Sequence, residues 1–112
     1  MKLYNKLVRD RIPEIIQATG KSADFEILSE KGYAAKLEEK LMEETKEYLE
    51  AKNTEELADL LEVIRALAQL QDCSMEELEA LRQKKAEERG AFKERLLLKQ
   101  VWDRDENPDP TT

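Results

Sequence analysis

Glu43-Glu44-Thr45-Lys46-Glu47 and, after eight intervening residues, Glu56-Leu57-Ala58-Asp59 are the two acidic motifs that decide the fold of this chain. Each motif is typical of a helix, in which residues three apart share one face. Asn53-Thr54 lies between them and is a natural break, because Asn or Thr before a helical run is a common N-cap. The sequence therefore predicts two antiparallel helices with a turn centred between Ala51 and Lys52.

Such a hairpin brings the acidic side chains of the two motifs together. Reflection about the turn pairs Glu47 with Glu56 and Glu44 with Asp59, so that four carboxylates meet across one helix–helix interface. Like charges at close range repel, and burial further disfavours each charged form. Protonation or a bound cation must then neutralise them. An all-oxygen ligand set suits Mg²⁺ or Mn²⁺, and facing helices commonly supply carboxylates to a metal site.

The alternative is that these acidic pairs are ordinary solvated surface. The chain has 26 acidic residues in 112, so pairs at helical spacing also arise by chance, and charged residues mostly stay exposed. The local context favours the buried interpretation. Glu44 occupies a position that the apolar stripe of Tyr33, Leu37, Leu41 and Tyr48 would otherwise fill with an apolar residue. We therefore expect Glu44 to point inward.

Composition narrows the class of protein. A length of 112 residues indicates one domain, and 40% charged residues with only three Gly and three Pro indicate long helices. The net charge of -7 argues against binding of a nucleic-acid polymer. A single cysteine, Cys73, suits the reducing cytoplasm. No apolar run is long enough for a signal peptide or a membrane span. Without histidine, an enzyme of this sequence would work through carboxylates, Lys, Arg and a metal ion.

The predicted fold is all-α: an antiparallel helical bundle built on the central hairpin. We expect one domain over residues 1–102 and a flexible C-terminal tail over 103–112, which has two prolines and no apolar residue. Residues 21–30 permit either a short strand or an extended connection. We expect four helices. A short one runs from near Pro13 to Gly20, and a long one is capped by Ser29. A second long helix runs from about Thr54 to Gln71, and the last runs from the capping box Ser74-Met75-Glu76-Glu77 to about Arg89, where Gly90 ends it.

The second long helix is apolar nearly all round in its latter half, from Leu60 to Leu70. A helix without a polar face is covered on several sides, so we expect a partner subunit and a homodimer or homotetramer. The alternative is a monomeric bundle with this helix at its centre. After Gly90, we expect Phe92 and the leucines of residues 96–98 to pack, and Val101-Trp102 to be the last anchored pair.

Two groups of basic residues flank the acidic motifs. Lys6 and Arg9 lie near the N-terminus, where they form either a solvated loop or a basic arm that reaches a phosphate. Lys84, Lys85 and Arg89 lie near the end of the last predicted helix. Cations in a last turn complement the helix dipole, which by itself accounts for this second group.

Taken together, these motifs resemble the MazG-type all-α nucleoside triphosphate pyrophosphohydrolases, a superfamily that includes phosphoribosyl-ATP pyrophosphohydrolase. The family motif E-E-x-x-E followed by E-x-x-D stands here at residues 43–47 and 56–59. The opening residues 4–13, YNKLVRDRIP, and residues 84–92, KKAEERGAF, are similar to a short single-domain branch of it. The spacer between Glu47 and Glu56 is shorter than in many members, so substrate choice does not carry over.

The resemblance implies Mg²⁺-dependent cleavage of a nucleoside triphosphate, or a related phosphoanhydride, between the α and β phosphates. It implies Glu44, Glu47, Glu56 and Asp59 as metal ligands, and Glu43 as a residue that orients a ligand or acts as a base beside Glu44 and Glu47. Lys6, Arg9, Lys84, Lys85 and Arg89 are the corresponding candidates for binding the phosphates. Removal of non-canonical nucleotides is the implied role. The alternatives are a non-catalytic helical interaction module of the same fold and a helical protein that only binds metal.

Overall fold

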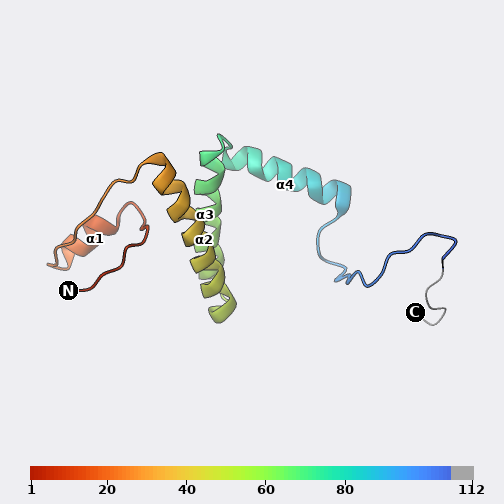
Figure 1. The fold of residues 1–112 in the computed structure, drawn as a ribbon, viewed down its shortest axis with the longest axis horizontal. Helices are drawn as coiled ribbons and strands as arrows, with labels where there is room; N and C mark the ends of the chain where they lie inside the picture. The colour runs from red at the N-terminus through yellow and green to blue at the C-terminus, as the bar shows by residue number, and fades with distance from the viewer. Residues whose placement is uncertain (107–112) are drawn as a thin grey trace. The chain divides into compact units, whose positions relative to one another are not determined.

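A computed structural model of the chain describes residues 1–106. Within them the structure is all-helical, as predicted, and contains no strand. The chain divides into two units, residues 1–78 and 79–112, which are described separately. Of the predicted C-terminal tail, residues 107–112 lie outside the described part. The helices, labelled in Figure 1, are α1 (Ile12–Ala18), α2 (Glu30–Ala51), α3 (Thr54–Leu70) and α4 (Met75–Arg89).

The centre of the first unit is the predicted hairpin of α2 and α3, which run side by side in opposite directions (Figure 1). Ser29 caps α2, its hydroxyl accepting a hydrogen bond from the Gly32 amide. Lys52 ends α2 in the left-handed conformation (φ 52°). Asn53 caps α3, its side-chain oxygen accepting a bond from the Glu56 amide at 3.0 Å. These caps satisfy helix-end groups that otherwise lack partners and set the register of the two acidic motifs.

Only a small core lies between α2 and α3. Leu37 of α2 and Val63 and Ala68 of α3 are the buried apolar residues of the described chain. Leu57 and Leu61 of α3 remain 46% and 50% exposed. The apolar pattern of α3 is therefore only partly covered within residues 1–78. The bundle and its completion by a partner subunit stay predictions.

The N-terminal segment contains the expected short helix. α1 begins at Ile12, one residue before Pro13, and Gly20 (φ 81°) follows its end. The left-handed conformation at Gly20 carries no steric penalty because glycine lacks a Cβ. Residues 21–29 form neither helix nor strand, which decides the open question there in favour of an extended connection.

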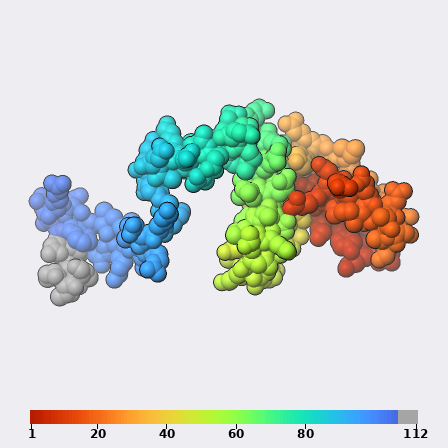
Figure 2. All heavy atoms as spheres, turned by 180° about the vertical axis from the view of Figure 1, so that it is seen from behind, coloured from red at the N-terminus to blue at the C-terminus, as the bar shows by residue number. Residues whose placement is uncertain are grey.

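The second unit starts at Glu79, after the first turn of α4, so the capping box at the start of this helix lies in the first unit. The predicted capping box is present: the Ser74 hydroxyl accepts from the Glu77 amide at 3.1 Å, and the Ser74 amide donates to the Glu77 carboxylate at 3.4 Å. Gly90, with φ 85°, follows the end of the helix. Figure 2 shows the residues after it, in blue, as a narrow run of side chains.

Within the second unit, the apolar residues after Gly90 that were predicted to pack are mostly exposed, and their packing stays a prediction. Phe92 is 97% exposed, and Leu96, Leu97, Leu98 and Val101 are 78–90% exposed. Trp102 is 45% exposed. These residues form no helix or strand.

None of the helices in residues 1–106 has the length and hydropathy that crossing a membrane requires.

Candidate metal centre

The hairpin register brings the predicted acidic residues together around Glu44. One oxygen from each of Glu43, Glu44 and Glu47 lies within 4.8 Å of the others. A second group with the same spacing is formed by Glu44, Glu56 and Asp59, and therefore joins α2 to α3. The predicted partners Glu44 and Asp59 thus lie in one cluster. Glu47 and Glu56 lie in two clusters that share Glu44.

Glu44 is the only buried charged residue of the described chain, with 6% of its surface exposed. The expectation that it points inward is confirmed. The pKa of Glu44 is raised because burial disfavours its carboxylate, and because the Glu47 carboxyl shares a hydrogen bond and adds like charge. Lys40, with its ammonium 3.4 Å from a Glu44 oxygen, acts in the opposite direction. Glu47 therefore raises the pKa of Glu44, and Lys40 lowers it.

Two carboxylate oxygens in the clusters are buried and lack a hydrogen-bond partner: Oε2 of Glu44 and Oε2 of Glu56. A hydrogen bond between Glu44 and Glu47 needs a proton on one of them, and an ionised Glu44 leaves Oε2 unsatisfied. Unsatisfied buried charge is costly in a folded protein. A hard divalent cation held by oxygen ligands removes that cost. The residues present therefore fit Mg²⁺ or Mn²⁺ in donor type, number and burial.

The N-terminal basic residues reach the same carboxylates. The Arg9 guanidinium donates to an Asp59 oxygen at 2.7 Å, and the Lys6 ammonium lies 3.5 Å from a Glu43 oxygen. Both basic side chains are about half exposed, at 57% for Arg9 and 45% for Lys6. The segment therefore contacts the acidic site, and its reach to a phosphate stays a prediction. In this arrangement Lys6 and Arg9 are counter-ions of the carboxylates.

Two lysines of α2 belong to the site but were not predicted from the sequence. Lys40 contacts both Glu43, at 3.3 Å, and Glu44. Lys36 donates to the main-chain oxygen of Asn5 at 3.1 Å. The three- and four-residue spacing from Lys40 to the acidic pair was a readable signal, because such residues are neighbours on a helix. The contact of Lys36 with Asn5 joins residues 31 apart in sequence, and no local pattern reports it.

These lysines line a cavity of about 240 Å³ between the N-terminal segment and α2. Its walls are Lys6, Leu7, Lys36, Glu39, Lys40 and Glu43. Lys40 and Glu43 thus belong both to the cavity and to the charged network around the carboxylates. A cationic hollow therefore adjoins the acidic clusters within the first unit.

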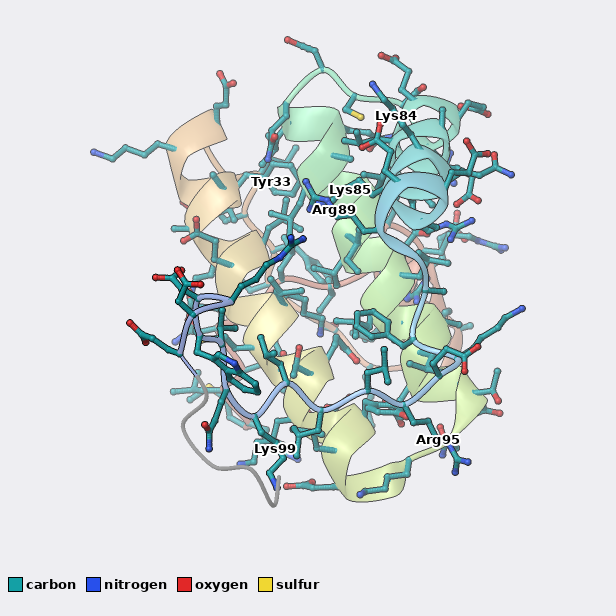
Figure 3. The ribbon with its side chains drawn as sticks, turned by 90° about the vertical axis from the view of Figure 1, so that its right-hand side faces the viewer. Tyr33, Lys84, Lys85, Arg89, Arg95 and Lys99 are labelled. Carbon is teal, nitrogen blue, oxygen red and sulfur yellow. The ribbon has the colours of Figure 1, made fainter. Side chains whose placement is uncertain are left out.

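The remaining predicted phosphate-binding residues, Lys84, Lys85 and Arg89, lie on α4 in the second unit and are exposed. Figure 3 shows Lys85 and Arg89, four residues apart, extending to the same side of the helix. A last-turn position favours Arg89 through the helix dipole. Their role toward a phosphate stays a prediction.

Comparisons with protein-family models, with curated proteins and with solved structures found no match to this chain. The resemblance to the MazG-type enzymes therefore rests on the motifs at residues 4–13, 43–47, 56–59 and 84–92 alone.

Proposed function

We propose that this chain is a Mg²⁺-dependent nucleoside triphosphate pyrophosphohydrolase that releases a nucleoside monophosphate and pyrophosphate. The observation that carries the proposal is the convergence of four acidic residues on Glu44, with two buried carboxylate oxygens left without partners. Acidic residues on a protein surface need no ligand. Buried ones without partners require protonation or a cation.

Glu44, Glu47, Glu56 and Asp59 are the residues that would hold the metal, and Mn²⁺ would fit the same donors. When bound, such a cation offsets charge on the phosphate oxygens and lowers the pKa of a bound water. The hydrolysis adds the oxygen of water to one phosphorus, and the bridging oxygen leaves with the other phosphate. Glu43 is the candidate to take the proton from the attacking water, since it lies in the first cluster with Glu44 and Glu47.

The basic residues are proposed to contact the phosphates. Lys6 and Arg9 already lie at the carboxylates, so they can reach phosphate groups bound there with small side-chain movements. Cations placed where negative charge develops stabilise the transition state. Lys84, Lys85 and Arg89 complete the proposed set, in a homodimer or homotetramer located in the cytoplasm. Removal of non-canonical nucleotides is the proposed role.

A second candidate is a non-catalytic interaction module of the same fold. The exposure of Phe92, Leu96, Leu97 and Leu98 favours it, because large apolar side chains left in water often mark a contact surface. Such a module would not need unpartnered carboxylates inside its helix hairpin. The pyrophosphohydrolase therefore accounts for more of the structure.

The test is to incubate the full chain with Mg²⁺ and a panel of canonical and modified nucleoside triphosphates, and to measure pyrophosphate and monophosphate together. We expect equal amounts of the two products. Glu47→Gln should lower kcat by at least about 100-fold, because even outer partners of metal ligands contribute 10–100-fold. Glu50→Gln, an exposed position on the same helix, is the matched control and should keep full activity. Retained activity in Glu47→Gln would refute the site, and no product with any nucleotide would favour the interaction module.

A further inference from the structure

We infer that the cavity lined by Lys6, Lys36 and Lys40 is an anion subsite that binds the pyrophosphate part of the substrate, an inference that rests on the proposed function. The cavity belongs wholly to the first unit and measures about 240 Å³. Liquid water occupies about 30 Å³ per molecule, so the hollow has room for roughly eight waters. The volume is therefore large enough for a diphosphate group.

The charge of the cavity wall favours a phosphate over a nucleoside. Three ammonium groups and two carboxylates face it, and Leu7 is its single apolar residue. No aromatic side chain lines it, so a base has nothing to stack on within this part of the described chain. Phosphate oxygens accept charge-assisted hydrogen bonds from ammonium groups, and these bonds are stronger than those between neutral partners.

The cavity lies directly beside the carboxylates. Glu43 and Lys40 are wall residues, and Lys40 bridges Glu43 at 3.3 Å and Glu44 at 3.4 Å. A phosphoanhydride that reaches the carboxylate clusters with its α phosphate can therefore place the next two phosphates in the cavity. The leaving pyrophosphate would remain there after the bond between the α and β phosphates breaks.

The lysines have the donors that this role requires. Each ammonium carries three N–H groups. Lys6 uses one of them on Glu43, and Lys36 uses two, on the Asn5 carbonyl at 3.1 Å and on Glu39 at 3.2 Å. A cation held by Glu44 would compete with Lys40 for that carboxylate, which would free the Lys40 ammonium for the anion. Lys36 stays in place through Asn5 and so positions the N-terminal wall of the cavity.

The experiment is calorimetric titration of inorganic pyrophosphate into the full chain at saturating Mg²⁺. Removal of one charge-assisted hydrogen bond should weaken binding about tenfold. We therefore expect Lys36→Gln and Lys40→Gln each to raise the Kd for pyrophosphate about tenfold. Lys46→Gln is the matched control, since Lys46 is exposed on the same helix and does not line the cavity. Lys36→Arg, which keeps the charge, should retain most of the affinity.

A second measurement separates a binding role from a structural one. In the absence of pyrophosphate, Lys40→Gln should bind Mg²⁺ more tightly, because a competing cation next to Glu43 and Glu44 is gone. A variant that merely disturbs the fold would instead bind Mg²⁺ and pyrophosphate more weakly. In the same way, Lys36→Gln should raise the KM for the nucleotide while its Mg²⁺ affinity stays unchanged.

The possible results test the anion subsite and the proposed hydrolysis separately. Pyrophosphate affinities of Lys36→Gln and Lys40→Gln within twofold of the unmodified chain would overturn the subsite, even if nucleotide hydrolysis is found. Loss of affinity in these two variants but not in Lys46→Gln would support the subsite. If no nucleotide is cleaved but the affinity for pyrophosphate still depends on Lys36 and Lys40, the proposed reaction is refuted and the anion subsite is supported.

Discussion

Two glutamates with basic neighbours at helical spacing behave in opposite ways in this protein. Glu44 of α2 lies near Lys40, and Glu79 of α4 is held by two contacts with Arg82 at 2.6 and 2.8 Å. The Glu44 side chain is 8% exposed, and that of Glu79 is 57% exposed. The pKa of Glu44 is raised by burial, whereas the hydrogen bonds from Arg82 lower the pKa of Glu79.

The difference shows what turns an acidic residue into a candidate ligand. At Glu79 water and Arg82 satisfy the carboxylate, so nothing further is needed there. At Glu44 burial removes water, the Glu47 carboxyl adds like charge, and one lysine does not satisfy both oxygens. The spacing of charges along a helix is similar in the two places. Only packing against a second helix separates the solvated ion pair at Glu79 from the buried carboxylate at Glu44, for which we propose a cation.

The sharpest test of this contrast is the response to Mg²⁺. A ligand at 100 times its Kd stabilises a folded protein by about 2.7 kcal/mol, so we expect Mg²⁺ to raise the Tm of the unmodified chain by several degrees and a chelator to reverse the rise. Glu44→Gln should remove most of this shift, because it takes a charged oxygen from both clusters. Thermal unfolding with and without Mg²⁺ measures it. An unchanged shift in Glu44→Gln would place the cation elsewhere.

In the metal-free protein, we expect pH to change the stability by less than Mg²⁺ does. Because the pKa of Glu44 is raised above its ordinary value of 4.5, protonated Glu44 stabilises the fold below pH 4.5, and this stabilisation is lost as the pH rises through the raised pKa. The substituted side chain of the Glu44→Gln variant stays neutral at all pH values. At pH 7 we therefore expect the free energy of unfolding of Glu44→Gln to be about 1 kcal/mol higher than that of the unmodified chain.

Denaturant unfolding of both proteins across this pH range, with chelator present, gives the comparison. The advantage of Glu44→Gln should shrink as the pH falls toward 4.5. A difference that is constant with pH would mean that Glu44 is not ionised near neutrality.

Removal of the ion pair between Arg9 and Asp59 should change the Mg²⁺ affinity by a still smaller amount. Arg9 occupies an Asp59 oxygen that a metal would use, so Arg9→Gln should bind Mg²⁺ about two- to fivefold more tightly, the range that an exposed ion pair allows. Calorimetric titration of Mg²⁺ without nucleotide measures this change. Arg11→Gln is the matched control, because Arg11 pairs with Glu14 outside the clusters. Weaker binding in Arg9→Gln would show that the arm supports the site instead of competing with a metal.

We expect the smallest effect from substitution of Glu79, the exposed glutamate of α4. Glu79→Gln removes an exposed carboxylate whose partner, Arg82, remains solvated. We expect neither the Mg²⁺-induced shift in Tm nor the rate of pyrophosphate release to change beyond experimental error. A clear loss of either would mean that the acidic residues of the two regions are not as different as their burial indicates.

Local signals in the sequence were enough to predict the helices. Ser29, Asn53 and Ser74 cap helices where their residue types predict caps, and Gly20 and Gly90 follow helix ends. These signals work because capping uses main-chain groups within three or four residues. After Gly90 no comparable local signal exists, because the apolar residues there follow no regular period.

The sequence by itself determined the all-helical class, the hairpin and the identity of the acidic residues around Glu44. These follow from helical periodicity and from a turn short enough to set the register of α2 against α3. Tertiary structure alone decided that Arg9 reaches Asp59 and that Lys36 reaches Asn5. The physical reason is that these contacts join residues 50 and 31 positions apart in the chain, and no short-range pattern encodes where such residues meet.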